Sequence, residues 1–145
     1  MASIEEIELA LKTLRDNGCP EIAILHCISS YPAELKQMNL ATISDIAKRF
    51  NVVAGLSDHT LDDLIPTTAV ALGASIIEKH VTLKRQDGGP DAYFSLEPVE
   101  LKQLVQAVRE TEKLIGNPTY GITGQEKENI IFRKSLFVVE DIKKG

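Results

Sequence analysis

Two apolar runs in the middle of the chain end in similar polar residues. The first is VVAGLSDHT at positions 52–60, and the second is SIIEKH at positions 75–80. Short apolar runs bounded by polar and turn residues are typical of buried strands, and each would deliver a histidine at its C-terminal end. These histidines, His59 and His80, are 21 residues apart. The spacing predicts a β–α–β unit whose two strands are parallel and adjacent.

His59 and His80 are candidates for a shared metal site. Adjacent strands lie about 4.8 Å apart, so both imidazoles can reach one ion if they point to the same face. Ligands also collect at the C-terminal ends of parallel strands, where both histidines fall. Two histidines make an open site, however, and most surface histidine pairs bind nothing. The local pattern therefore leaves two alternatives, a metal pair or two hydrogen-bonded loop histidines.

Polar residues near the histidines supply further candidates. Glu78 lies two residues before His80, so strand alternation puts both on one face, and Ser57 has the same relation to His59. Because Glu78 stands in an apolar strand, we expect a buried carboxylate that needs a partner or a metal-site ligand. Lys79 is a poor partner because it points to the opposite face.

Other polar residues each allow two interpretations. Asp91 lies in a Gly-Gly-Pro-Asp loop and could swing over the site as an acid or base, or could be a turn aspartate. Ser29 and Tyr31 follow the first strand and could hydrogen-bond a polar substrate or belong to an ordinary loop. Asp58 can hydrogen-bond the backbone of its own loop. We interpret His26, in mid-strand, as a hydrogen-bonded core residue rather than a ligand.

Helices and strands alternate along the rest of the chain. A capping box at Ser3 and Glu6 predicts the start of a helix that ends at Asn17-Gly18. The other expected elements are strands at 21–27, 52–57 and 75–79 and helices at 39–50, within 62–72 and from 97 onward. The α-β-α-β-α-β-α order predicts a parallel sheet with right-handed crossovers. Because the strands are near-continuous apolar runs, both faces of the sheet are expected to need cover.

Composition excludes several classes of protein. Hydrophobic residues make up 43% of the 145 residues, which is ordinary for a globular domain, and the formal charge of −5 leaves no basic stripe for nucleic acid. We expect no signal peptide and no membrane span, because no apolar run approaches the ~20 residues needed to cross a bilayer. Cys19 and Cys27 lack metal-knuckle spacing and are expected to be reduced, partly buried thiols of a cytoplasmic protein.

The composition changes at about residue 119. Two glycines and the charged run at 126–129 predict a linker, and positions 132–139 predict the start of a strand. We therefore expect an α/β domain at 1–118, followed at 119–145 by a linker and the truncated start of a second domain.

Four motifs, in this order, resemble those of the sialic acid synthase family: CISSYP at 27–32, GLSDHT at 55–60, ALGA at 71–74 with IEKH at 77–80, and GPD at 89–91 with SLEP at 95–98. This family comprises the N-acetylneuraminate, legionaminate and pseudaminate synthases. FSLEP at 94–98 and RFNV at 49–52 are more similar to the pseudaminate branch, which we favour, whereas GPD is more similar to the neuraminate branch.

The resemblance implies a fold and a reaction. The family fold is a TIM (β/α)8 barrel followed by an antifreeze-protein-like domain, usually in a homodimer. The strands here would be the last three βα units of the barrel, and 119–145 would lead into the small domain. The reaction condenses phosphoenolpyruvate with the aldehyde of an N-acylated amino sugar, giving a nine-carbon α-keto acid and phosphate.

The resemblance also assigns roles to residues. His59 and His80 would bind a divalent metal, usually Mn²⁺ with Mg²⁺ as the alternative. Ser57, Ser29 and Tyr31 would contact substrate, although some relatives have asparagine at the position of Ser29. Glu78 and Asp91 would support the metal ligands and transfer protons.

Parts of the family's active site have no counterpart in these 145 residues. They include the first five strands, which carry phosphate-binding lysines and an essential glutamate. We therefore expect a synthase fragment that is inactive alone. Two alternatives are a non-catalytic half-barrel that self-associates through its strand edges and a metal-binding module. A flavodoxin-like module would place acidic residues at the strand ends, where this chain has histidines.

Overall fold

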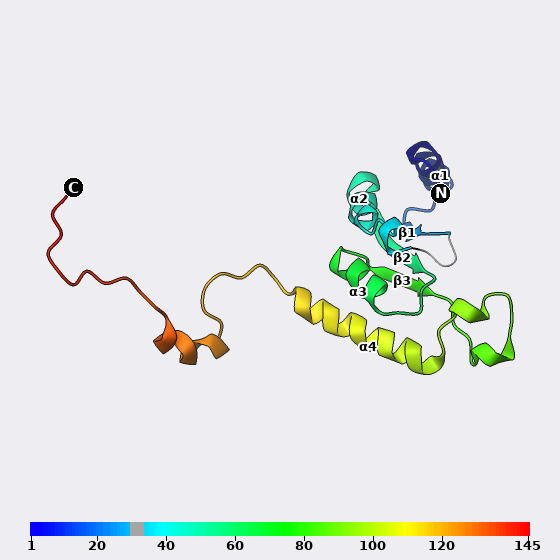
Figure 1. The fold of residues 1–145 in the computed structure, drawn as a ribbon. Coiled ribbons are helices and arrows are strands. Elements are labelled where there is room, and N and C mark those ends of the chain that lie inside the picture. Colours follow the sequence, from blue (N-terminus) through cyan, green and yellow to red (C-terminus); the bar gives the residue numbers. More distant parts are fainter. Residues whose placement is uncertain (30–33) are drawn as a thin grey trace.

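The structure is a computed structural model, and it describes residues 1–29 and 34–145. Helices and strands alternate as the sequence predicts (Figure 1). They are α1 (Ile4–Asp16), β1 (Ala23–Cys27), α2 (Ala41–Phe50), β2 (Val53–Asp58), α3 (Leu64–Ala71), β3 (Ile76–Lys79) and α4 (Pro98–Ile115). Short 3-10 helices lie at Leu35–Gln37, Arg85–Asp87, Ala92–Phe94 and Gln125–Phe132.

The strands form one parallel sheet in the order β1-β2-β3, which confirms the predicted β–α–β unit. Its register is decisive for the site. Ser57 pairs with Glu78, and the next residues along the two strands, Asp58 and Lys79, also pair. Since successive side chains of a strand point to opposite faces, the two pairs lie on opposite sides of the sheet.

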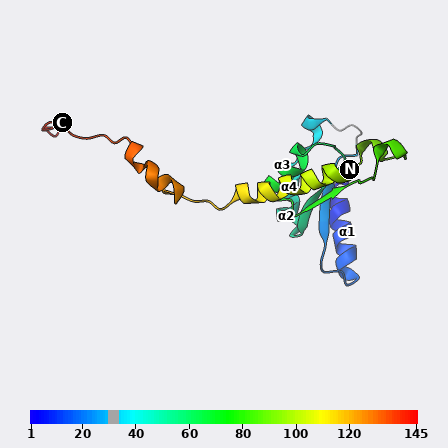
Figure 2. The ribbon, with the colours of Figure 1, turned by 90° about the horizontal axis from the view of Figure 1, so that it is seen from below.

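The core lies between the sheet and the helices on one of its faces. Ala54 and Leu56 of β2 are buried in one cluster with residues of α2 and α3, such as Ile43 and Ala69. Helix α1 lies beside β1 and α2, and α4 packs along α3 (Figure 1 and Figure 2). Within residues 1–29 and 34–145 the opposite face stays largely open, with Val53 and Ile76 exposed on it, so the expected cover on both faces is present on one only.

Local sequence signals explain where the helices begin and end. Ser3 Oγ accepts a hydrogen bond from the Glu6 amide, and Glu6 accepts one from the Ser3 amide, which confirms the capping box. Pro66 lies in the first turn of α3, where a missing amide proton costs no helical hydrogen bond. Helix α2 begins later than predicted because Asn39 adopts a left-handed conformation, with φ of 42°.

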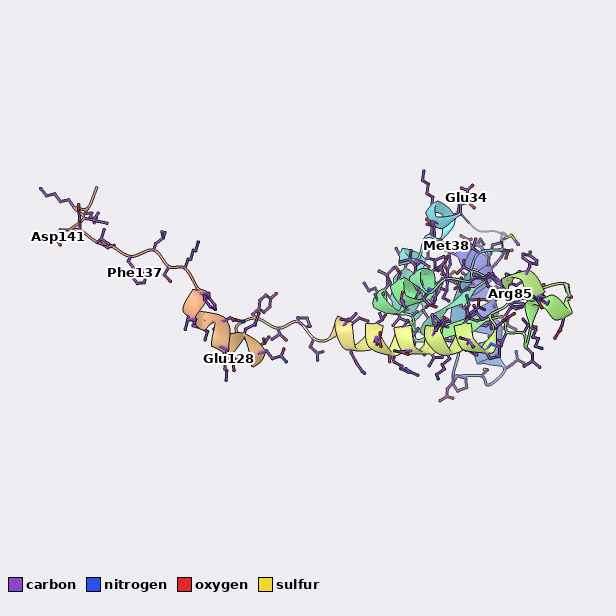
Figure 3. The ribbon with its side chains drawn as sticks, turned by 60° about the horizontal axis from the view of Figure 1, so that its bottom comes forward. Glu34, Met38, Arg85, Glu128, Phe137 and Asp141 are labelled. Atoms are coloured by element: carbon purple, nitrogen blue, oxygen red, sulfur yellow. The ribbon has the colours of Figure 1, made fainter. Side chains whose placement is uncertain are left out.

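The segment 119–145 extends away from the sheet and helices, and its residues are exposed, as Figure 3 shows for Glu128, Phe137 and Asp141. The predicted strand at 132–139 is wrong. Phe132 ends a 3-10 helix, and residues 133–139 have no regular structure. A strand needs a neighbouring strand for its backbone hydrogen bonds, and none of the described strands lies beside this segment. The division into two domains stays a prediction.

Two smaller expectations concern membranes and cysteines. Among the helices formed by residues 1–29 and 34–145, none is both long and apolar enough to cross a bilayer. Cys19 and Cys27 are free thiols, as predicted. Cys27 is half-buried, but Cys19 is exposed in the turn after α1, so the expectation of burial was wrong for Cys19.

Candidate functional site

The two predicted histidines lie together at the C-terminal ends of β2 and β3. Their ring centroids are 5.1 Å apart, and the ring planes meet at 47°. Phe94, on the loop after β3, packs edge-on against both rings, with centroid distances of 5.5 Å to His59 and 4.9 Å to His80. The expectation that both imidazoles lie on one side of the sheet is therefore confirmed.

Ser57 and Glu78, each two residues before a histidine, face each other on the open side of the sheet. Ser57 Oγ donates a hydrogen bond of 2.7 Å to Glu78 Oε1. The sequence predicted a buried carboxylate here, and this was wrong, because Glu78 is exposed. The apolar run correctly indicated a strand, but no described element covers the face to which Glu78 points. The serine hydroxyl partners a carboxylate that also remains in contact with solvent.

On the helix side of the same strand ends lies a buried ion pair that the sequence interpretation missed. Lys79 Nζ is 2.8 Å from Asp58 Oδ2, and the two side chains are 4% and 1% exposed. Asp58 Oδ1 accepts from the Thr60 amide at 3.1 Å, as expected for a loop aspartate, and Lys79 also donates to the Thr60 carbonyl. Aligning the strand ends Ser-Asp-His and Glu-Lys-His would have revealed opposite charges at matching positions.

Asp91 approaches the site from the loop after β3. Its Oδ2 lies 3.7 Å from His80 Nδ1, too far for a hydrogen bond but close enough for electrostatic attraction to a protonated imidazole. Ser95 Oγ donates to the Asp91 carbonyl at 2.7 Å, and the Leu96 amide donates to the His80 carbonyl at 2.8 Å. The loop thus brings Asp91 to His80, as the sequence suggested.

Arg85 anchors the same loop to α4. Its guanidinium donates to both oxygens of Glu100 and, at 3.0 Å, to the Ser95 carbonyl. The hydrogen bond from Arg85 and a second from the Glu97 amide lower the pKa of Glu100 to about 2. An ion pair between two long side chains therefore connects the start of the loop to the helix that follows it.

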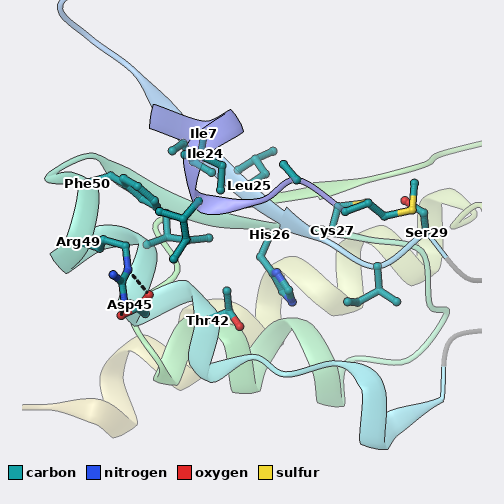
Figure 4. A pocket seen from close by; sticks show the side chains of 15 residues that line it. Ile7, Ile24, Leu25, His26, Cys27, Ser29, Thr42, Asp45, Arg49 and Phe50 are labelled. Carbon is teal, nitrogen blue, oxygen red and sulfur yellow. Dashed lines mark hydrogen bonds and ion pairs between the residues drawn. The ribbon is translucent and has the colours of Figure 1, made fainter. Parts of the chain in front are cut away.

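Of the remaining predicted residues, Ser29 lies apart from the histidines. It lines a groove of about 710 Å³ along the outer edge of β1, between α1 and α2 (Figure 4). Neither His59 nor His80 lines this groove. Tyr31 lies outside the described residues. His26 has Nε2 2.8 Å from the Met38 carbonyl, which confirms that it is hydrogen-bonded, but it is half-buried and lines this groove, so its placement in the core was wrong.

Comparison with known proteins identifies the family. The model of the NeuB family matches residues 1–120. The chain belongs to the NeuB family. It is 44% identical to the N,N'-diacetyllegionaminic acid synthase of Campylobacter jejuni and 38% identical to the pseudaminic acid synthase of that organism. Both alignments cover 100% of this chain, but 44% and 42% of those two proteins.

A solved structure supports the same assignment. The N-acetylneuraminic acid (sialic acid) synthetase from Leptospira borgpetersenii, in complex with citrate, superposes with a TM-score of 0.78 and 38% identity. The match covers 94% of this chain and 47% of that one. The resemblance to sialic acid synthases is thus confirmed at the level of the family. This NeuB-family chain spans less than half the length of the curated relatives it matches.

The donor groups of this NeuB-family chain fit a divalent metal with two protein ligands. Burial and the neighbouring His80 lower the pKa of His59, which favours the neutral imidazole that metals bind. Within 1–29 and 34–145, no group of three or more histidine, cysteine or acidic side chains is arranged around a common point. Two imidazoles alone would leave coordination positions open for water or substrate.

Proposed function

We propose that this chain forms part of a nonulosonic acid synthase. The reaction condenses phosphoenolpyruvate with the open-chain aldehyde of an N-acylated amino sugar, giving a nine-carbon α-keto acid and phosphate. Membership of the NeuB family and the names of the two Campylobacter relatives support this class of reaction. The observation that carries the proposal is the pair of imidazoles, 5.1 Å apart at adjacent strand ends.

The proposed architecture is that of the last three βα units of a TIM barrel. The parallel order β1-β2-β3 and the match to 47% of a solved synthetase support it. In this proposal, residues 119–145 lead toward an antifreeze-protein-like domain, and the complete protein is a homodimer. In this architecture the substrates would bind at the C-terminal ends of β1, β2 and β3, as they do in other barrel enzymes.

His59 and His80 would hold a divalent cation, Mn²⁺ or Mg²⁺. When bound, the ion supplies a Lewis acid for an aldehyde oxygen and for a water molecule. The low pKa of His59 keeps its ring available as a ligand at neutral pH. Phe94 packs edge-on against both rings and covers part of the pair. Asp91, beside His80 Nδ1, is placed to orient that ring.

The open face of the sheet would take the substrates. Ser57 has a hydroxyl that donates to Glu78 Oε1 at 2.7 Å in this structure and that can turn to donate to an oxygen of phosphoenolpyruvate instead. Asp91 and Glu78 are the carboxylates that can accept or return protons near the histidines. Ser29 and Tyr31, which follow β1 in the sequence, are proposed to contact substrate. The sugar is proposed as a class, because both the legionaminic and the pseudaminic relatives are similar to this chain.

The test uses the complete polypeptide that contains this chain. Phosphate release is measured with phosphoenolpyruvate, Mn²⁺ and a panel of N-acylated amino sugars, and Mn²⁺ binding is followed by electron paramagnetic resonance. His59→Ala and His80→Ala should each abolish metal binding and turnover. The control is His26→Gln, which changes the third histidine but keeps a hydrogen-bonding group toward Met38. Normal Mn²⁺ binding by both alanine variants, or no turnover with any sugar, would contradict the proposal.

A second candidate is a non-catalytic module that self-associates. The open face of the sheet favours it, because Val53 and Ile76 are apolar and 48% and 38% exposed there. Sedimentation of the 145-residue chain tests this possibility. A well-behaved monomer over a hundredfold range of concentration would rule it out.

A further inference from the structure

We propose that the buried pair Asp58–Lys79 is a positioning device that sets the relative placement of His59 and His80. The proposal rests on the proposed metal site, because it explains how two loop-end imidazoles reach one ion. Asp58 and Lys79 do not touch the metal or the substrate in this assignment. They act from the helix side of the sheet, through the backbone on which the histidines stand.

The connections surround His59 on both sides. Asp58 precedes it, and Thr60 follows it. Asp58 Oδ1 accepts from the Thr60 amide at 3.1 Å and lies 3.0 Å from its Oγ1, which closes a tight turn around the histidine. Lys79, the residue before His80, joins both flanks by donating to Asp58 Oδ2 and to the Thr60 carbonyl. One ammonium group therefore joins the residues on both sides of His59 to the strand that carries His80.

Stability alone does not explain this pair. Removing two charges from water costs free energy that their attraction only partly returns, and replacing such a pair with apolar residues is often neutral or stabilising. Burying a lysine and an aspartate whose side chains are 4% and 1% exposed is therefore less favourable for the free energy of folding than burying apolar side chains of similar size. What a charged, hydrogen-bonded pair adds is a single geometry, since Lys79 and Asp58 satisfy their donors and acceptors in one arrangement.

On the opposite side of the sheet, Phe94 restricts the orientation of the two imidazole rings. Phe94 is 8% exposed and packs edge-on against both imidazoles, so it limits the rotation of the rings once the backbone is fixed. The pair sets where the two strand ends stand, and the phenyl ring restricts how the side chains turn. Phe94 also makes the placement measurable, because its ring current shifts the imidazole proton resonances according to their distance from it.

The experiment compares Lys79→Met, Asp58→Asn and the double variant in the complete protein. Lys79→Met leaves a buried aspartate without its cation and should lower the melting temperature, whereas the double variant buries no unpaired charge and should recover most of that loss. Positioning predicts a different pattern for the metal. The dissociation constant for Mn²⁺ should rise about 10- to 100-fold in Lys79→Met and stay raised in the double variant.

The control is Ile43→Val, which trims a fully buried core side chain on α2. It should lower the melting temperature and leave the Mn²⁺ constant unchanged. Imidazole resonances of His59 and His80, recorded without metal, provide the second measurement. They should shift in both the single and the double variants and remain in place in Ile43→Val.

Recovery of wild-type Mn²⁺ affinity and wild-type imidazole shifts in the double variant would overturn the proposal, because the pair would then serve stability alone. Failure of the wild-type protein to bind Mn²⁺ would contradict the proposed metal site. In that case the imidazole resonances recorded without metal would still test the positioning role, because they should shift in the single and double variants whether or not Mn²⁺ binds. If Lys79→Met does not fold, Asp58→Asn and the double variant give the same comparison.

Discussion

Ser57 and Glu78 occupy directly opposite positions on β2 and β3, and the serine hydroxyl donates to the carboxylate across 2.7 Å. The next pair along the same strands, Asp58 and Lys79, is equally close but points to the other face and is buried. Two polar contacts one residue apart therefore differ in their surroundings. Substitutions in the exposed pair should change function with little change in stability, and substitutions in the buried pair should change both.

We predict that Ser57→Ala raises the KM for phosphoenolpyruvate in the complete enzyme. A hydrogen bond to a charged group contributes about 1.5–3 kcal/mol, which corresponds to about 10- to 100-fold in KM. The melting temperature should change little, since the residues of this pair are not buried. Steady-state kinetics with phosphoenolpyruvate as the varied substrate measure the effect. An unchanged KM would remove Ser57 from the proposed binding site.

Asp91→Asn should lower kcat by about 10²- to 10⁴-fold if Asp91 transfers a proton, because that is the usual contribution of a general acid or base. The fold should be unaffected, because the Asp91 side chain is exposed and Arg85 anchors the loop. Asp87→Asn is the matched control on the same loop. Single-turnover rates distinguish the two variants, and an equal, small effect of both would assign Asp91 to the turn.

The Arg85–Glu100 pair predicts a dependence of stability on pH. The pKa of Glu100 is about 2 in the folded protein and 4.5 in an unfolded chain. The stabilisation is therefore complete above pH 4.5 and is lost as the pH falls toward 2. Glu100→Gln should flatten this part of a urea-denaturation profile measured against pH. Glu110→Gln, on the same helix, is the control, and it should leave the profile as steep as that of the wild type.

Gly55→Ala should destabilise the sheet. A Cβ atom on Gly55 would lie 2.4 Å from the backbone oxygen of Ile76 and 2.6 Å from Leu25 Cδ2. Overpacking of this kind costs about 1–3 kcal/mol, and the backbone of β3 cannot move aside without losing its ladder. Chemical denaturation measures the loss. Gly124→Ala, where a Cβ meets nothing within 4 Å, should be nearly neutral. Equal stability of the two variants would contradict this account.

The 145-residue chain alone should release no phosphate from phosphoenolpyruvate and an N-acylated amino sugar in the presence of Mn²⁺. The physical reason is that the open face beside Ser57 and Glu78 gives a substrate contact from one side only. A colorimetric phosphate assay is sufficient. Clear turnover, absent from the His59→Ala chain, would show that the three βα units contain a working site.

The sequence predicted those features that depend on short-range chemistry. Ser3 and Glu6 cap α1 as expected, since a capping box is complete within four residues. The two apolar runs became adjacent parallel strands, and the histidines that follow them came together. Periodicity and end signals are sufficient for such features.

Features that depend on distant partners were not predictable in the same way. The exposure of Glu78 depends on whether another element covers its face, which an apolar run does not reveal. The partner of Lys79 lies 21 residues away and became recognisable only when the two strands were placed in register. The segment at 132–139 has the composition of a strand, but composition supplies no neighbouring strand to pair with it.

The alternation at Ser57, Asp58 and His59 restricts how this site can change in evolution. Inserting or deleting one residue within β2 would exchange the two faces, turning the histidine toward the helices and the aspartate toward the open side. The connections on either side of α3, residues 61–63 and 72–75, are under no such restriction, because an added residue there only lengthens a connection. The lasting signature of this site is therefore two tripeptides at matching strand ends, and the 21-residue interval between them is free to vary.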